Sequence, residues 1–580
     1  MQRNASDLKR HIDVAAGRAP ADLALRNARI VNVLSCEILE GDIAIVDDRI
    51  VGVGAYRGRE NVDLRGRHVC PGFIDGHVHI ESSLLSVPEF ARLVSVHGTT
   101  AVIADPHEIA NVMGAEGIRF MLGSSKYCPI YVYAMISSCV PASRFESAGA
   151  ELSAEDIEPL LADRWVLGLA EMMNYPGVVA GDEECLRKIA LSAPRPVDGH
   201  CPGLGGGALC AYVASGIQSD HECVTLEEAR EKLRAGLHIM IREGSQAKNL
   251  DALLPLVTPD TLDRFSFVTD DKDVEDLLAE GHIDHLVRRA VAAGMNPTHA
   301  IKLATINTAR LFGLRDQGAV APGRLANLAV LDDLEACRVA QTYHAGRLVS
   351  EDGATLDPDA SRRKPHVLRS TMNVHWIEPD HFAIRVDAAA PECDVNVIEA
   401  LENRIDTRRA TERMPVRDGQ LHADPDRDLA KMVVIERHQA SGNMGRAFVR
   451  GFGLRAGAIA STVAHDSHNL VVIGVNDRDM YAAAVHLAKL RGGFCAVRDG
   501  KVLADVALPI AGLMSDADAE TLNQQLRTLH AAAATLGAAL RRPFMAMSFL
   551  TLSVIGSLKL TDQGLVDVDR FALIDLVLDR

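Results

Sequence analysis

Two histidines separated by a single residue give the sharpest chemical signal in the sequence. His77 and His79 lie in the segment PGFIDGHVHIESS, whose apolar residues fit a short strand. Residues i and i+2 of a strand share one face, so both imidazoles can reach the same ion. The pair alone is weak evidence, because two such histidines are often ordinary surface or core residues.

Other residues of metal-ligand type follow at intervals of one, two or three strand–helix units of about 30 residues. They are two histidines and two carboxylates, namely Glu171, His200, His221 and Asp270. Together with the histidine pair they form a set that is costly to bury without a cation, and its members suit Zn, Mn or Fe. The alternative, hydrogen-bonded core histidines with salt-bridged carboxylates, is weaker for a set of this size.

The size of this set predicts two ions rather than one. A single tetrahedral ion needs four ligands, and six are present. Glu171 lies in sequence between the pair His77 and His79 and the pair His200 and His221, so its two oxygens can bridge two ions. Two metal ions a few ångströms apart can hold a hydroxide between them at neutral pH. We therefore expect two divalent transition-metal ions, manganese or iron, with zinc as the alternative.

The middle of the chain, residues 71–315, alternates strand and helix patterns, which predicts βαβ units and a parallel sheet. Eight short apolar strands are expected, and they end at FIDGHVH, AVIADPHE, YVYAMISSC, VLGLAEM, PVDGH, GIQSDHE, HIMIREG and FSFVTDD. Eight such units match a (β/α)8 barrel, an α/β fold whose active site lies at the C-terminal ends of the strands. The candidate ligands all lie at these ends.

The two flanks of this region have a different texture. Residues 22–70 and 317–350 show β-branched alternation broken by Gly, Asp and Asn, which predicts short strands. Two strand-rich flanks around one inserted domain predict a small β-sandwich built from both. Residues 351–365 are polar and contain proline, so we expect a linker there, followed by an additional C-terminal α/β domain over residues 366–580.

Composition restricts the class of partner. The 61 Lys and Arg residues against 78 Asp and Glu give a net charge of −17, which argues against nucleic acids and anionic membranes as partners. The 11 cysteines form no C-x-x-C motif, which indicates a reducing compartment. The N-terminus lacks a signal-peptide pattern, and the longest apolar stretch, residues 544–558, is shorter than the roughly 20 residues of a spanning helix. We expect a cytoplasmic protein that acts on a small molecule.

Several blocks of sequence resemble a known family. PGFIDGHVHIESS, PTHAIKLATINTARLFGL and GAVAPGRLANLAVLD are similar to the amidohydrolase superfamily of metal-dependent barrels. Within it, HGTTAVIADPHEIANVMG, AEMMNYPGV, DGHCPGL, SDHE, VTDD and STVAHDSHNLVVIGVNDRDM resemble the bacterial adenine deaminases, over nearly the whole chain from about residue 22. Many binuclear amidohydrolases have a carboxylated lysine on strand 4, whereas this chain has Glu171, as adenine deaminases do.

This resemblance implies a reaction. The expected activity is hydrolytic deamination of adenine to hypoxanthine and ammonia by a metal-bridging hydroxide, in a homo-oligomer of two or more chains. One alternative is an amidohydrolase that acts on another aminopurine or a cyclic amide ring. Another is a non-catalytic barrel that serves as an assembly subunit, although such proteins typically lose metal ligands and this chain keeps all six.

The strand ends also supply candidate catalytic and substrate-binding residues. We expect Asp270 to move the proton, together with Glu171, because a carboxylate there can take a proton from the nucleophile. Asp271 is the alternative, but on a strand it faces the opposite way. Three further candidates follow the second strand, and they either contact the purine or orient the metal ligands; they are Asp105, His107 and Glu108. Arg242 is a fourth candidate, which either lines the pocket or forms an ordinary ion pair. The C-terminal cluster is either part of the site or a solvated or interface loop; its candidates are His465, Asp466 and His468.

Overall fold

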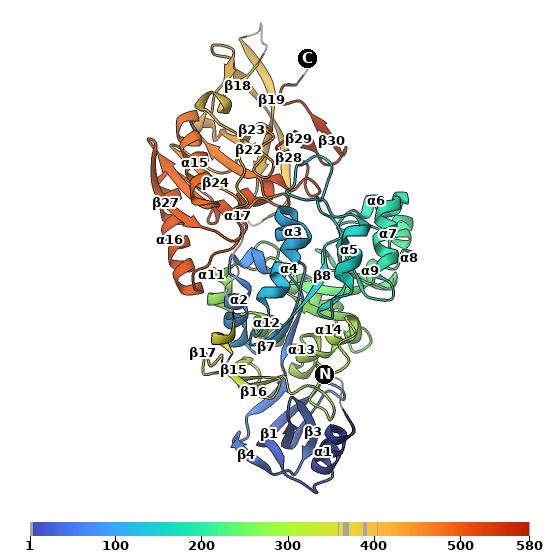
Figure 1. Ribbon diagram of the computed structural model, residues 1–580. Helices are drawn as coiled ribbons and strands as arrows, with labels where there is room; N and C mark the ends of the chain where they lie inside the picture. Colours follow the sequence, from blue (N-terminus) through green and yellow to red (C-terminus); the bar gives the residue numbers. More distant parts are fainter. Residues whose placement is uncertain (1–3, 358, 364–369, 387–390, 403, 579–580) are drawn as a thin grey trace.

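The computed structural model describes residues 4–357, 359–363, 370–386, 391–402 and 404–578. Figure 1 shows three parts in a row: strands from both flanks at one end, a strand–helix region in the middle and the C-terminal sheets at the other end. A short helix, α1 (Ala5–Ala15), precedes the first strand. The expected start of the C-terminal domain at residue 366 lies outside the described residues.

Parallel strands in chain order form the central region, which we define as residues 73–311. Five strands form one sheet and three form a second; they are β6 (Phe73–Val78), β7 (Thr99–Ala104), β8 (Tyr131–Ile136), β9 (Val166–Met172) and β10 (Val197–Gly199), then β11 (Ser219–Asp220), β12 (His238–Arg242) and β13 (Phe265–Val268). Backbone hydrogen bonds join the two sheets at both ends, from Gln218 to Val197 at 3.0 Å and from Asp270 to His77 at 2.9 Å. The predicted series of parallel strands is confirmed.

The strands of the central region are covered on both faces. Every residue of β6 and β7 is buried, as expected for parallel strands with helices around them, and this explains their continuous apolar sequences. The helices that alternate with the strands are α2 (Val87–Ser95), α3 (His107–Met113), α4 (Ala115–Ser124), α5 (Ala154–Leu161), α6 (Tyr175–Ala180), α7 (Glu183–Ser192), α8 (Gly206–Ala214), α9 (Leu226–Arg234), α10 (Leu250–Leu253), α11 (Val274–Glu280), α12 (Ile283–Ala292), α13 (Pro297–Leu303) and α14 (Ile306–Leu311).

A glycine allows close approach where the two central sheets meet. A Cβ atom on Gly199 at the end of β10 would lie 2.2 Å from the carbonyl oxygen of Ser219 in β11. No side chain fits in that space, so only glycine lets the two strand ends come this close. The next residues along the two strands, His200 and His221, consequently lie with their ring centroids 5.6 Å apart.

One nine-stranded sheet combines the two flanks of the chain. The strands are β1 (Ala21–Asn32), β2 (Glu37–Val46), β3 (Arg49–Gly54), β4 (Gly58–Asp63) and β5 (His68–Pro71), then β14 (Leu328–Asp333), β15 (Arg338–His344), β16 (Arg347–Glu351) and β17 (Ala354–Thr355). The flanks meet where β5 pairs antiparallel with β14. Strand β17 lies inside residues 351–365, so the expected linker begins with strand structure.

The described residues of the C-terminal part form three further sheets. The largest has eight strands: β19 (Glu392–Ala400), β20 (Thr407–Pro415), β22 (Ala430–Ile435), β23 (Met444–Arg450), β24 (Ala458–Ser461), β25 (Leu470–Gly474), β26 (Gly493–Arg498) and β27 (Lys501–Ala507). A small pair is formed by β18 (Ile384–Arg385) and β21 (Gln420–Leu421), and a three-stranded sheet by β28 (Leu558–Thr561), β29 (Gly564–Asp567) and β30 (Ala572–Ile574). The helices are α15 (Asp477–Leu490), α16 (Ala519–Thr535) and α17 (Pro543–Ser548).

The C-terminal part and the central region share one hydrophobic core. A single cluster contains Val78 and Phe90 from the central region and Phe452 and Met547 from the C-terminal part. Arg542 adds hydrogen bonds of 2.9 and 2.5 Å to the carboxylate of Asp276 in α11. The apolar stretch 544–558, expected to be core rather than a membrane span, lies within this contact. None of the helices in the described ranges is long and apolar enough to cross a membrane.

A chain that ends at Asp359 should therefore lose solubility. Removal of the C-terminal part would leave the apolar side chains of the shared cluster in water, at a cost of roughly 25 cal/mol per Å² of exposed apolar surface. We expect the shortened protein to aggregate in size-exclusion chromatography with light scattering, whereas the full chain elutes as a defined species. A soluble, folded shortened protein would mean that the C-terminal part is a separable module.

Candidate active site

The two histidines at the end of β6 point the same ring nitrogen toward one place. His77 Nδ1 lies 2.9 Å from Asp198 Oδ2, and His79 Nδ1 lies 3.0 Å from the carbonyl oxygen of Asp105. Each Nδ1–H is thus held by an acceptor, which leaves the two Nε2 atoms facing each other at 3.2 Å. Two lone pairs directed at one point are the arrangement that a cation stabilises. The residues therefore fit a metal ion.

Asp270 completes the group around the histidine pair. Its Oδ1 lies 2.9 Å from His79 Nε2 and 3.4 Å from His77 Nε2, while Oδ2 accepts a hydrogen bond of 2.7 Å from Arg242 Nη1. Burial favours the neutral carboxyl, but Arg242 and the two imidazoles hold the pKa of Asp270 well below its ordinary value. Asp270 is therefore a charged acceptor within reach of a cation.

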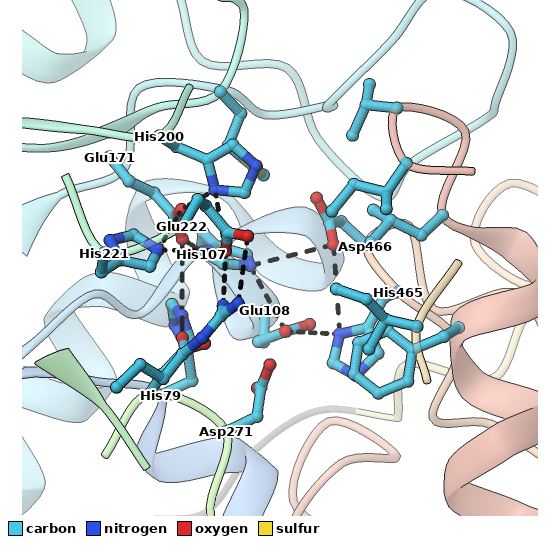
Figure 2. Close-up of a pocket in the computed structure, with 18 residues that line it drawn as sticks. His79, His107, Glu108, Glu171, His200, His221, Glu222, Asp271, His465 and Asp466 are labelled. Atoms are coloured by element: carbon cyan, nitrogen blue, oxygen red, sulfur yellow. Dashed lines mark hydrogen bonds and ion pairs between the residues drawn. The ribbon is translucent and has the colours of Figure 1, made fainter. Parts of the chain in front are cut away.

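The expectation that Asp271 faces away from the site is wrong. Strand β13 ends at Val268, and Asp270 has a φ of +58°, so the alternation of a strand does not extend to these two residues. Figure 2 shows Asp271 beside His79 in the pocket, where its Oδ1 accepts a 2.5 Å hydrogen bond from Ser82 Oγ. Burial and the nearby charge of Asp270 raise the pKa of Asp271. The carboxylates of both Asp270 and Asp271 therefore line the pocket.

Glu171, at the end of β9, lies between the two histidine pairs. Its Oε1 is 3.4 Å from His79 Nε2, and its Oε2 is 2.7 Å from His200 Nδ1 and 3.3 Å from His221 Nε2. The rings of His77 and His221 stack with centroids 4.0 Å apart. The six residues selected from the sequence are therefore brought together, with one oxygen of Glu171 directed to each pair.

Glu222 is a site residue that the sequence analysis missed. It lies 3.5 Å from His221 Nε2 and 3.7 Å from His200 Nδ1, and both of its oxygens accept hydrogen bonds from Arg242. A residue next to a strand histidine is expected to face the opposite way, but β11 ends at Asp220, before both residues. The signal available in the sequence was the run SDHE, in which three residues of ligand type follow one another.

The residues after β7 connect the cluster to the C-terminal part. His107 Nδ1 lies 3.1 Å from Asp105 Oδ2 and 3.5 Å from Glu171 Oε1. Glu108 Oε1 is 2.6 Å from His465 Nδ1, and its other oxygen is hydrogen-bonded to His468 Nε2. Of the two C-terminal histidines, only His465 lines the pocket, and His468 acts behind it by holding Glu108.

The C-terminal part also forms an apolar roof over the pocket. His465 stacks on Phe549 with ring centroids 4.4 Å apart, and Asp466 Oδ1 lies 3.9 Å from His107 Nε2 (Figure 2). The apolar residues that line the pocket are Met173, Ile405, Phe549, Leu552, Val554 and Ile555. The pocket thus has a floor of imidazoles and carboxylates and a roof of hydrophobic side chains.

The charge balance of the floor favours a cation. Burial lowers the pKa of an imidazole, but neighbouring carboxylates reverse the effect here and raise the pKa of His79 to about 10 and that of His200 to about 9. Protons on these rings compensate carboxylates such as Glu171, whose pKa lies well below its ordinary range despite burial. A metal ion would displace those protons and provide the same compensation. The cluster, with carboxylates able to accept protons beside it, is suited to metal-assisted hydrolysis.

A buried lysine holds the roof in place. Lys559 Nζ in β28 donates hydrogen bonds of 2.7 Å to the carbonyl oxygen of Phe549 and 2.9 Å to that of Ile405, and both of these residues line the pocket. The described residues place no carboxylate in hydrogen-bond contact with this ammonium. Burial consequently lowers the pKa of Lys559 to about 7.

Comparisons with known proteins agree with this arrangement. Residues 68–349 match the amidohydrolase family, and residues 404–572 match the adenine deaminase C-terminal domain. A protein named adenine deaminase from Dehalococcoides mccartyi strain CBDB1 is 47% identical over 99% of both chains. Proteins of the same name from Oleidesulfovibrio alaskensis strain G20 and Brucella anthropi are 48% and 44% identical, and they cover 97% and 98% of this chain and 98% and 100% of their own lengths.

Lys559 generates a prediction about the pH dependence of stability. Between about pH 7 and 10.5 the unfolded chain keeps the lysine proton and the folded chain does not, so the free energy of unfolding receives a contribution that increases with pH in this window. In Lys559→Met this contribution should be absent, so urea titrations at several pH values should give a less positive slope than in the wild-type protein. Parallel curves for the two proteins would show that Lys559 is charged in the folded state.

Proposed function

Because the chain belongs to the adenine deaminases of the amidohydrolase family, we propose that it hydrolyses adenine to hypoxanthine and ammonia. Water adds its oxygen to C6 of the purine, the C6–N bond to the amino group breaks, and the amino group leaves as ammonia. The observation that supports this most directly is similarity over 99% of the chain to proteins of that activity, joined to a buried cluster suited to metal-assisted hydrolysis.

Two divalent transition-metal ions fit the floor of the pocket. Their proposed ligands are His77, His79, Glu171, His200, His221 and Asp270. When bound, such ions would lower the pKa of water toward neutrality and so supply a nucleophile. Manganese or iron, with zinc as the alternative, stays a prediction from the sequence.

Asp270 and Glu171 are the proposed proton carriers. Asp270 Oδ2 accepts a hydrogen bond from Arg242, which fixes the orientation of the carboxylate. Its other oxygen, Oδ1, faces the histidine pair at the floor of the pocket. We assign to Asp270 the proton of the attacking water and its return to the departing nitrogen. Glu171 has an oxygen on each side of the cluster and can share that proton during the transfer.

The purine ring is proposed to lie between the floor and the apolar roof. Phe549 and Leu552 would cover its face, and His107 with Asp466 would hydrogen-bond its edge. Asp105 and Glu108 would act indirectly, by holding His107 and His465, since their oxygens are already engaged there. Arg242 is bound to Glu222 and Asp270, so its proposed role is to fix these two acids rather than to contact substrate.

We also infer the finer organisation of the chain from its sheet connections. The central region would form a (β/α)8 barrel over residues 71–315, because hydrogen bonds link the two parallel sheets at both of their meeting points. Residues 22–70 and 317–350 would form the composite β-sandwich, and residues 366–580 the C-terminal α/β domain. A homo-oligomeric state and a cytoplasmic location stay predictions from the sequence.

The free base should be strongly preferred over its nucleoside. The roof is apolar, so the hydroxyl groups of a ribose on the purine would lose water without gaining hydrogen-bond partners. We expect kcat/KM for adenine to exceed that for adenosine by at least about 100-fold in an assay of ammonia release. Comparable values, or faster turnover of another aminopurine or a cyclic amide, would contradict the substrate assignment.

Paired substitutions at neighbouring carboxylates test the proton carrier. Asp270→Asn keeps an oxygen for coordination but cannot accept a proton, and loss of such a group typically costs 10²–10⁴-fold, so kcat should fall by at least about 100-fold. Asp271→Asn, a matched change in the same pocket, should have a much smaller effect. Metal content and circular dichroism of both variants establish that each is folded and loaded. If Asp271→Asn abolishes turnover and Asp270→Asn does not, the roles are exchanged.

A further inference from the structure

Two fully buried residues connect the segments that present His200 and His221. Asp220 is the last residue of β11, and Lys232 lies in helix α9 behind it. The side chains of both are completely inaccessible to solvent. A buried Lys–Asp pair needs a specific arrangement of hydrogen bonds, because an unmatched charge in the interior is strongly destabilising.

The carboxylate of Asp220 binds the backbone on both sides. Its Oδ1 accepts a 2.9 Å hydrogen bond from the amide of Cys201, and its Oδ2 accepts one of 3.1 Å from the amide of Glu222. The thiols of Cys201 and Cys223 also donate to it, each at 3.3 Å. One side chain therefore fixes the residue that follows His200 and the residue that follows His221.

Lys232 completes this connection from the other side. Its ammonium donates to the carbonyl oxygen of Cys201 at 2.7 Å, to Asp220 Oδ2 at 2.9 Å and to Glu228 Oε1 at 2.8 Å. The three hydrogens of the ammonium are thereby used. Cys201 is bound at both its amide and its carbonyl group, so the backbone next to His200 has little freedom to rotate.

The strands themselves provide little of this alignment. β10 has three residues and β11 has two, and the two strands belong to different sheets that meet at this place. Short strands contribute few ladder hydrogen bonds to hold their ends in register. The Asp220–Lys232 pair lies at one of the two places where the central strands pass from one sheet to the other, and two candidate ligands must be aligned there.

We propose that Asp220 and Lys232 are positioning residues that hold His200 and His221 in the geometry that binds metal, with Glu222 fixed beside the two rings. The inference rests on the metal site of the proposed function. Neither residue contacts the pocket, and both act through the backbone of the segments that they join. Partners of this kind, one step behind metal ligands, typically change metal affinity by 10–100-fold when they are removed.

Metal titration of the full-length protein tests this role. Apoprotein is prepared with a chelator and titrated with Co²⁺, whose visible absorption reports coordination directly and does not depend on turnover. The Kd of Lys232→Met should rise by about 10–100-fold relative to wild type. An unchanged Kd in folded Lys232→Met would overturn the proposal.

A second buried lysine provides a matched control. Lys431 in β22 is also buried, although its partner Asp477 is partly exposed, and it donates hydrogen bonds of 2.6 Å to Asp477 and 3.4 Å to the carbonyl oxygen of Phe382. Both partners lie in the C-terminal part, and none of the three lines the pocket. Lys431→Met removes the same chemical group from a similar pair. We expect it to leave the Co²⁺ affinity within about twofold of wild type. A loss equal to that of Lys232→Met would show that general destabilisation is responsible.

Two further measurements apply if Lys232→Met does not fold. The double variant Lys232→Met/Asp220→Asn removes both fully buried charges, and Glu228, the other partner of Lys232, keeps its hydrogen bonds from the amides of Gly203 and Val224. Its Kd should stay raised, and wild-type affinity in a folded double variant would overturn the proposal. In wild-type apoprotein, hydrogen exchange at the amides of Cys201 and Glu222 should already be slow. Fast exchange there, slowed only when Co²⁺ is added, would show that metal rather than the pair orders these segments.

The same titration separates this inference from the proposed function. Wild-type apoprotein should bind about two equivalents of Co²⁺, one for each half of the cluster. Failure of the wild type to bind metal would refute the metal site itself. Normal binding by the wild type with normal binding by Lys232→Met would refute only the positioning role.

Discussion

The structure depends on one electrostatic constraint: several imidazoles and carboxylates are buried together at the ends of parallel strands. Such a group is stable only if each charge is compensated, and the surroundings of the pocket provide that compensation. Arg242 lies between Glu222 and Asp270, and the imidazole pair of the C-terminal part holds Glu108. Because the remaining lone pairs of His77 and His79 converge, cations bound there would compensate the carboxylates in place of the protons on the imidazoles. Arg242 and the two histidines that hold Glu108 therefore serve this one requirement.

The main features of the fold follow from local sequence patterns. Short apolar runs that end in polar residues predicted where each parallel strand stops. A strand that is buried on both faces is apolar along its whole length, so the first polar residues mark its end. The same patterns predicted that six residues of ligand type lie at the strand ends, where the structure brings them together; they are His77, His79, Glu171, His200, His221 and Asp270. The errors lie just beyond the strand ends: the period of two no longer applies at Asp271 and Glu222, so their direction depends on turns that sequence periodicity does not describe. Asp198 was missed for a different reason, since a residue that orients a ligand has no spacing rule of its own.

The contribution of the C-terminal part could not be derived from periodicity at all. The cluster around His465 contains suitable residue types, but only tertiary contacts decide whether they face the pocket or the solvent. The contact is extensive, because one hydrophobic cluster spans both parts and Glu108 is bound from the far side by two histidines. The site is therefore a property of the interface between the two parts. A change in how they pack would alter the roof and the charge of Glu108 together.

The position of the roof in the chain has a consequence for biosynthesis. Every proposed metal ligand precedes residue 271, whereas Phe549 and Lys559, which holds its backbone, come much later in the chain. Because translation delivers the chain from its N-terminus, these ligand residues leave the ribosome before the residues that cover them. The pocket can therefore close only after the C-terminal part has emerged and packed onto the core that it shares with the central region.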